Sequence, residues 1–240
     1  MGIFDKLSSS GLEKEKDVLG GRKIYDSDIY VGPIKLAYAI QSDGGALGLD
    51  LTVSIDGSDY REILWVSNKN GNNFYEDKSG KKRGLPGYTI ANDICLIATE
   101  TELSDVETEE KVVRVYDSKE NGEVNKSVPM LMPLIGKEIA LAILQETEFK
   151  QEKTDSGYVD TDQKIQTNRI SKVFHPELKV TIAEAMEGKE AAFWDAWIEQ
   201  NKGRVVDRTA RGSRGGAAKA GSAKAGGSSK APKQSLFGNK

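Results

Sequence analysis

Two residue types that build many active sites are almost absent from this chain of 240 residues, which has one cysteine and one histidine. The single cysteine, Cys95, excludes an internal disulfide, and His175 alone leaves too few ligands for a Cys/His metal centre. His175 also has no nucleophile motif beside it, so a serine–histidine hydrolase is not expected. We therefore predict a protein that is not an enzyme and needs no cofactor or metal.

Long apolar runs are also missing. No stretch of about 18 apolar residues occurs, so we expect no membrane-spanning helix. The opening MGIFDKLSSS lacks the apolar core of a signal peptide, and Lys6 departs from the myristoylation pattern. Residues 79–84 lack the spacing of a phosphate-binding loop, and the acidic run at 100–110 lacks that of a calcium loop. These absences favour a cytoplasmic protein that does not hydrolyse nucleotides.

Acidic residues are missing from the C-terminal segment. Residues 208–240 contain eight cations and no Asp or Glu, which leaves 26 cations and 37 anions, or a charge of −11, on residues 1–207. Because Gly, Ala, Ser and Lys dominate, we expect a disordered tail over 204–240, after an N-terminal segment 1–20 and one domain over 21–203. The basic tail favours a polyanionic partner or a contact with the acidic body, or it serves solubility alone. Leu236 and Phe237 near its end are either a docking peptide or merely part of the terminus.

What is present is a β-rich pattern. Residues 29–40, 46–55 and 60–67 are apolar or alternate apolar with polar side chains, and Asp-Gly at 56–57 marks a tight turn. Isoleucines at helical spacing predict a helix over 88–100 that Thr89 caps.

The second half of the body continues this pattern. We predict strands over 111–118, 126–134, 136–149 and 167–175, a mobile loop over 150–165 and one helix over 181–203 that packs on the sheet. The fold class is therefore mainly β with α. The order of elements favours an OB-like (oligonucleotide/oligosaccharide-binding) antiparallel Greek-key barrel with a helix after the third strand and a C-terminal helix.

The long loop over residues 68–88 combines cations with aromatics. Cations neutralise phosphates and aromatic rings stack on unpaired bases, so this mixture suits a single strand. The alternative is that Tyr75 and Tyr88 pack the loop down while its lysines are merely solvated. Trp65 faces either the core or the ligand, because its neighbours in the alternation are mixed. The candidate DNA-binding residues are Trp65, Lys69, Phe74, Tyr75, Lys78, Lys81, Lys82, Arg83 and Tyr88, with Arg208, Arg211 and Arg214 of the tail.

Two motifs, LPGY-x-x-AN from Leu85 and TEEKVV-x-VYD from Thr108, carry a resemblance. Together with the surrounding residues 15–205, the chain resembles the single-stranded DNA-binding proteins of tailed bacteriophages. The resemblance implies an OB-fold protein that coats single-stranded DNA during phage replication and recombination, in the host cytoplasm. The matching positions are Trp65, Tyr75, Lys81, Lys82 and Tyr88. Many such proteins end in an acidic tail that recruits partners, whereas this chain ends in a basic one.

We therefore expect largely sequence-independent binding and protection of single-stranded DNA in phage replication and recombination, with phage replication or recombination proteins as further candidate partners. An alternative is a protein-interaction or recombination-adaptor module. A second is RNA binding, which RGSRGG in the tail weakly favours.

Overall fold

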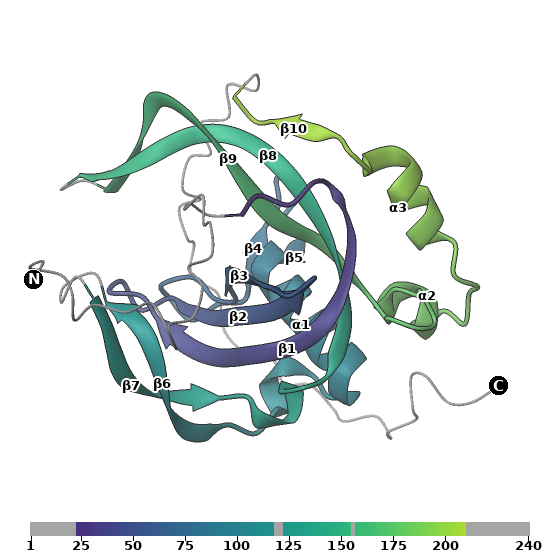
Figure 1. Ribbon diagram of the computed structural model, residues 1–240, viewed down its shortest axis with the longest axis horizontal. Coiled ribbons are helices and arrows are strands. Elements are labelled where there is room, and N and C mark those ends of the chain that lie inside the picture. Colours follow the sequence, from purple (N-terminus) through teal and green to yellow (C-terminus); the bar gives the residue numbers. More distant parts are fainter. Residues whose placement is uncertain (1–22, 118–121, 155–156, 210–240) are drawn as a thin grey trace, which may run out of the picture.

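The computed structural model describes residues 23–117, 122–154 and 157–209 (Figure 1). They form a mainly antiparallel β-structure with few helices, which confirms the predicted class. An eight-stranded sheet makes up most of it, and a two-stranded hairpin stands apart. The predicted N-terminal segment 1–20, the tail from residue 210, and with it Arg211 and Arg214, lie outside the described residues.

The predicted three-stranded meander is present. It consists of β1 (Asp28–Gln41), β2 (Leu47–Ile55) and β3 (Ser58–Trp65), all antiparallel. The first half of β1 pairs with β8 and the second half with β2, so β1 belongs to both parts of the sheet. Gly32 lies just before this change of partner. A Cβ atom there would stand 1.9 Å from the backbone oxygen of Ser54, so only glycine lets the two backbones approach.

Gly32→Ala is therefore expected to destabilise the fold by about 1–3 kcal/mol, the usual cost of forcing an extra group into a packed site. The free energy of unfolding, measured in urea, tests this. Gly44→Ala is the matched control, since its Cβ would meet only the Ser42 hydroxyl, at 3.9 Å. Equal stability of the two variants would show that β1 passes β2 with more room than the structure gives it.

Two long hairpins complete the large sheet. β6 (Glu109–Asp117) pairs with β7 (Gly122–Met130), and β8 (Glu138–Thr154) pairs with β9 (Gly157–Phe174). The prediction of a loop over 150–165 was therefore wrong, because most of these residues extend β8 and β9. Their side chains are exposed on both faces, so the segment has no apolar alternation to reveal it.

The sheet does not close into a barrel through backbone pairing in the described part of the chain. Its two free edges near the core are β3 and β9. A side chain connects them: the Glu62 carboxylate on β3 accepts a hydrogen bond of 2.8 Å from the backbone N–H of Ile170 on β9. Just beyond, Asn168 on β9 exchanges two hydrogen bonds with the backbone of Tyr25. The N-terminal part of the described chain thus lies along β9.

The loop after β3 contains a hairpin that the sequence analysis did not predict. β4 (Phe74–Glu76) pairs with β5 (Lys82–Gly84), and α1 (Pro86–Thr99) follows at once. The predicted helix is confirmed, but Thr89 does not cap it. Leu85 is the N-cap residue and has no side-chain bond, while the Thr89 hydroxyl donates back to the Leu85 carbonyl. Short 3₁₀ turns occur at Leu103–Asp105 and Met132–Leu134.

The predicted helix over 181–203 is two helices, α2 (Ile182–Met186) and α3 (Phe193–Asn201). Gly188, with a φ of 62°, ends the first. As predicted, the segment packs on the sheet, where Trp197 is buried against Ala140, Ala142 and Phe174. Next, β10 (Val205–Asp207) runs parallel to β8, so the start of the predicted tail belongs to the sheet.

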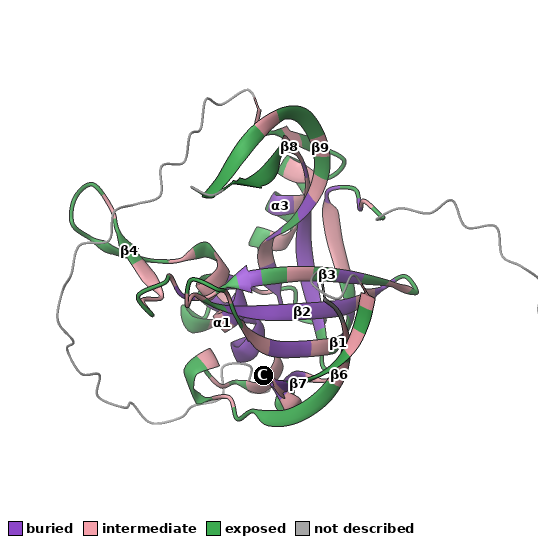
Figure 2. Ribbon diagram, turned by 90° about the vertical axis from the view of Figure 1, so that its left-hand side faces the viewer, coloured by how far each residue is buried: buried purple, intermediate pink, exposed green. Residues whose placement is uncertain are grey.

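The main core lies between the sheet and α1. The inward side chains of β1, β2, β3, β8 and β9 meet the buried face of the helix, which includes Ile90, Ile94 and Ile97 as predicted. A smaller cluster lies on the other face of β1, where the β6–β7 hairpin packs over Tyr38. The outward side chains of β3 are partly or fully exposed, whereas β2 is buried along nearly its whole length (Figure 2).

Candidate functional site

The outward face of β3 presents three side chains in a row. Arg61, Ile63 and Trp65 alternate with the inward Tyr60, Glu62 and Leu64, so they point to the same side of the sheet. Ile63 is 39% exposed and Trp65 is 43% exposed. Two residues of a strand span about 6.6 Å, so the three groups stand roughly that far apart along the strand. Trp65 therefore faces outward and not the core.

A glycine on the neighbouring strand supports the Trp65 ring. Gly48 is the register partner of Trp65, and a Cβ at Gly48 would lie 3.1 Å from Cε3 of the indole. The same Cβ would lie 3.1 Å from Ile40 on β1. The missing side chain thus lets the indole pack down against β2 beside Ile40. One part of the ring is held by the sheet, and the remainder is exposed.

The start of α1 fixes the end of β3. A Cβ on Gly87, in the first turn of the helix, would lie 2.4 Å from the Trp65 carbonyl oxygen. The helix therefore approaches the backbone of Trp65 as closely as a glycine allows. Because β3 is paired on one side and covered here by α1, the indole is attached to a rigid part of the fold.

Arg61 belongs to a satisfied polar group. Its Nε and Nη2 atoms donate to the two carboxylate oxygens of Asp50, at 2.8 and 2.5 Å, and Asp50 is only 2% exposed. The Tyr38 hydroxyl donates to the same carboxylate at 2.8 Å, and burial together with this bond raises the pKa of Tyr38 to about 12. The bonds to Asp50 raise the pKa of Arg61. Arg61 is thus a permanent cation, half exposed, with a fixed orientation.

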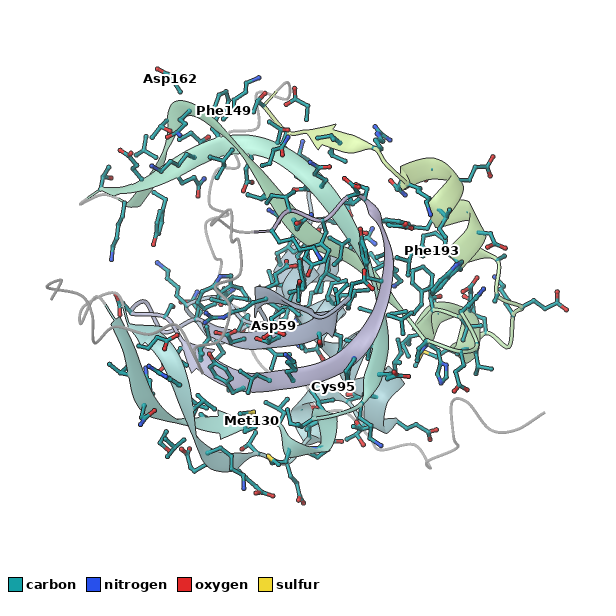
Figure 3. All side chains as sticks on the ribbon, viewed as in Figure 1. Asp59, Cys95, Met130, Phe149, Asp162 and Phe193 are labelled. Atoms are coloured by element: carbon teal, nitrogen blue, oxygen red, sulfur yellow. The ribbon has the colours of Figure 1, made fainter. Side chains whose placement is uncertain are left out.

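A cleft of about 650 Å³ adjoins this row. It is lined by residues 59–63 of β3 together with Lys23 and Tyr25, and so shares Arg61 and Ile63 with the row. Both acidic groups in it are engaged, since Asp59 pairs with Lys35 at 2.5 Å and Glu62 accepts the hydrogen bond from Ile170. Figure 3 shows Asp59 on the concave side of the curved β8–β9 hairpin. The cleft thus offers apolar surface beside two engaged cations, since Arg61 is held by Asp50 and Lys23 Nζ lies 4.5 Å from the centre of the Tyr25 ring.

The β8–β9 hairpin extends beyond the body on the same side as the β6–β7 hairpin (Figure 1). Its outer part reaches toward the β1–β2 turn, where Lys153 Nζ lies 3.9 Å from a carboxylate oxygen of Asp43. Both side chains are largely exposed, so this contact contributes little free energy. The hairpin forms an arch over the side of the sheet that carries the cleft.

The β4–β5 hairpin divides the predicted cation–aromatic cluster between two faces. Tyr75 is the register partner of Arg83, and side chains of directly paired residues share a face. Phe74 and Lys82 lie on the other face, with Lys82 Nζ 4.4 Å from the centre of the Phe74 ring. Tyr88 lies there too, since its Cδ1 is 3.8 Å from the Cβ position of Gly84. The hairpin projects from the body beside α1 (Figure 2).

The lysines of this loop are exposed. In the described part of the chain no carboxylate within 4.0 Å pairs with Lys69, Lys78, Lys81 or Lys82, whereas Arg83 bonds to Asp77 at 3.0 Å. Asp77 also accepts from the Ser79 hydroxyl and from backbone N–H groups of the turn. Its hydrogen bonds from Ser79 and Arg83 lower its pKa to about 2, so Asp77 stays an anion within the cationic loop.

Arg208, predicted to contact DNA, has a structural partner in the folded body. Its guanidinium donates through Nε, at 2.7 Å, and through Nη2 to the carboxylate of Glu146 on β8, which is fully buried. Arg169 on β9 donates to the same carboxylate at 3.2 Å. The three residues tie β10 to the base of the β8–β9 hairpin, so Arg208 belongs to the folded body.

We refer to the outward row of Arg61, Ile63 and Trp65 as the Trp65 platform. The sequence analysis missed the residues that shape it. Gly48 gave no signal by itself, because its role depends on its register with Trp65. Arg61 and Ile63 alternate with inward residues in the same way as Trp65, but the alternation alone did not say which set faces outward.

No protein-family model matches the chain, and a search of curated proteins finds no relative. No helix among the described residues is long and apolar enough to span a membrane.

Proposed function

We propose that this protein binds single-stranded DNA, largely without sequence preference, by stacking bases on Trp65 and neutralising phosphates with the surrounding cations. The observation that carries the proposal is the outward indole of Trp65, held on Gly48 and 43% exposed, in one row with Ile63 and Arg61. A rigid aromatic with an open face accepts any base, since every base has a π-face. Its neighbour Ile63 extends the apolar surface, and Arg61, whose charge is balanced by the buried Asp50, has a fixed orientation at the end of the row.

The architecture supports an open variant of the OB barrel. A three-stranded meander shares its first strand with a second pair of strands, a helix follows the meander, and β3 approaches β9 through the Glu62 contact. In OB folds the ligand crosses the second and third strands between two loops. The corresponding exposed surface here is the outward face of β3, flanked by the β1–β2 turn and the β8–β9 hairpin.

The charge distribution suits a single strand. The loop over 68–88 carries five cations against two acids on an otherwise acidic body, beside a platform on which unpaired bases can stack. Duplex readout would require a helix or ribbon shaped to enter a groove. An extended strand would instead follow the surface from Trp65 toward the cleft or toward the β4–β5 hairpin.

Binding of the full-length chain to an oligo-dT is expected to weaken steeply as salt rises, with a slope of log K against log salt of about −0.7 per neutralised phosphate. Titrations with single-stranded and duplex oligonucleotides of equal length, each at two salt concentrations, measure this. The single strand is expected to bind more tightly at both. Equal affinity for strand and duplex, or no response to salt, would contradict the proposal.

A charge variant assigns part of this slope to the hairpin. Lys81→Gln combined with Lys82→Gln removes two exposed cations and is expected to reduce the slope by roughly 1.4 units. Lys137→Gln, an exposed lysine on the turn before β8, is the control and is expected to leave it unchanged. An unaltered slope in the double variant would place the phosphate contacts on other cations.

A further inference from the structure

The side of the molecule away from the hairpin tips has an exposed apolar surface of its own. Figure 1 places α2 and α3 there, opposite the ends of the β6–β7 and β8–β9 hairpins. Three large apolar side chains are exposed: Leu178 at 49%, Met186 at 65% and Phe193 at 45%. Figure 3 shows Phe193 at this side of the body. We refer to the exposed surface of residues 177–199 as the α2–α3 surface.

The parts of this surface are tied together. The Glu184 carboxylate on α2 accepts hydrogen bonds from the backbone N–H groups of Ala192 and Phe193 at the start of α3. The Phe193 ring stacks on Phe174, with ring centres 6.1 Å apart, and Lys179 lies over Trp194. The turn, α2 and the start of α3 thus form one fixed surface whose apolar groups stay exposed.

The same surface is acidic. Residues 177–199 contain six carboxylates and two lysines, a net charge of −4. One lysine, Lys189, pairs with Glu187 at 2.5 Å. Among the described residues no cation lies within 4.0 Å of the carboxylates of Glu177, Glu190 or Asp195. The surface therefore combines apolar contacts with negative charge, and it suits a segment that is both apolar and basic.

The chain supplies such a segment. Residues 210–240 contain seven cations and no acid, and their only large apolar residues are Leu236 and Phe237. Three cations, Lys230, Lys233 and Lys240, flank that pair. We propose that Leu236 and Phe237 dock on the α2–α3 surface of their own chain, with the flanking lysines facing its carboxylates.

Chain length allows this contact within one molecule. A coil of the roughly 25 residues between Thr209 and Ser235 spans about 25–30 Å on average. The path back from Thr209 along β10 and α3 to the start of α3 measures at most about 40 Å, from the lengths of an extended chain and of a helix. A tether of matching length gives the segment a local concentration of about millimolar order. Docking would place the lysines beside Leu236 and Phe237 on the α2–α3 surface, and it would leave Arg211, Arg214, Lys219, Lys224 and the Trp65 platform available. The docking does not depend on what Trp65 binds.

A spin label tests the docking in the full-length chain without any DNA. A nitroxide is attached through Ser235→Cys, and the amide signals are read by NMR. Cys95 does not compete for the label, because it is buried and its pKa is raised to about 12. The amides of Leu178, Met186 and Phe193 are expected to lose most of their intensity, equally at all protein concentrations. Broadening that grows with protein concentration would show that the segment docks on a second copy of the chain. No broadening, or broadening spread evenly over the whole protein, would overturn the docking.

Matched variants separate docking from a merely nearby tail. Leu178→Ser with Met186→Ser is expected to restore the signals of the α2–α3 surface, as is Leu236→Ala with Phe237→Ala. Val112→Ser, another exposed apolar residue but on β6, is the control and is expected to restore nothing. Broadening that survives both double variants would contradict the assigned contact.

Discussion

Trp65→Ala is expected to weaken binding of an oligo-dT roughly 5- to 150-fold, because stacking a base on one aromatic contributes about 1–3 kcal/mol. The indole is the one large aromatic in the outward row of β3, and Gly48 holds it in place. Trp65→Phe keeps a ring on the same strand and is expected to lose less. Binding is measured by fluorescence anisotropy of a labelled oligonucleotide at one fixed salt concentration.

Tryptophan fluorescence gives this prediction a second readout. Trp197 is buried and Trp194 is partly buried against the far side of the sheet, so Trp65 is the tryptophan placed to sense a bound strand. Quenching by single-stranded DNA is therefore expected in the native protein and absent in Trp65→Phe. Val112→Ala, which removes an exposed apolar group from β6, serves as the control for affinity. A folded Trp65→Ala protein with native affinity would remove the platform from the proposal.

Local patterns in the sequence predicted those elements whose two faces differ. The meander and the apolar face of α1 were predicted because one side of each is apolar and the other is more polar, and this difference leaves a period in the sequence. The β8–β9 hairpin was missed beyond residue 149 because its outer part is exposed on both faces. The single helix over 181–203 was wrong because a glycine at positive φ divides an otherwise helical pattern.

The site shows the same limit more sharply. The sequence identified Trp65 but left its face undecided, since that depends on which strand lies beside it. The register with Gly48 decides it: a residue 17 positions earlier has no side chain, and the indole takes its place. The loop over 68–88 was read as one cluster, yet pairing within its hairpin separates Tyr75 and Arg83 from Phe74 and Lys82. Long-range register, rather than composition, therefore determines which predicted residues act together.

Arg208→Met is expected to destabilise the protein by roughly 1–3 kcal/mol, the cost of leaving a buried charged group partly unsatisfied. The Glu146 carboxylate is fully buried, and Arg208 provides two of the three arginine hydrogen bonds that it accepts. Adding Glu146→Met removes the buried charge itself. The double variant is then expected to regain most of the loss, because a well-packed apolar group often replaces a buried ion pair at little cost. Urea unfolding of both variants measures the difference.

Two truncations separate this structural role from DNA binding. A chain ending at Thr209 keeps Arg208 and the β10 pairing, so it is expected to unfold at the native urea concentration while binding oligo-dT more weakly, having lost seven cations. A chain ending at Asp207 also loses Arg208 and the hydrogen bond from its backbone N–H to the Thr147 carbonyl, so it is expected to be destabilised at least as much as Arg208→Met. If both truncated chains were equally stable, Glu146 would not depend on Arg208. If the longer one bound with native affinity, the tail would act on something other than DNA, which is the outcome that docking on the α2–α3 surface alone would give.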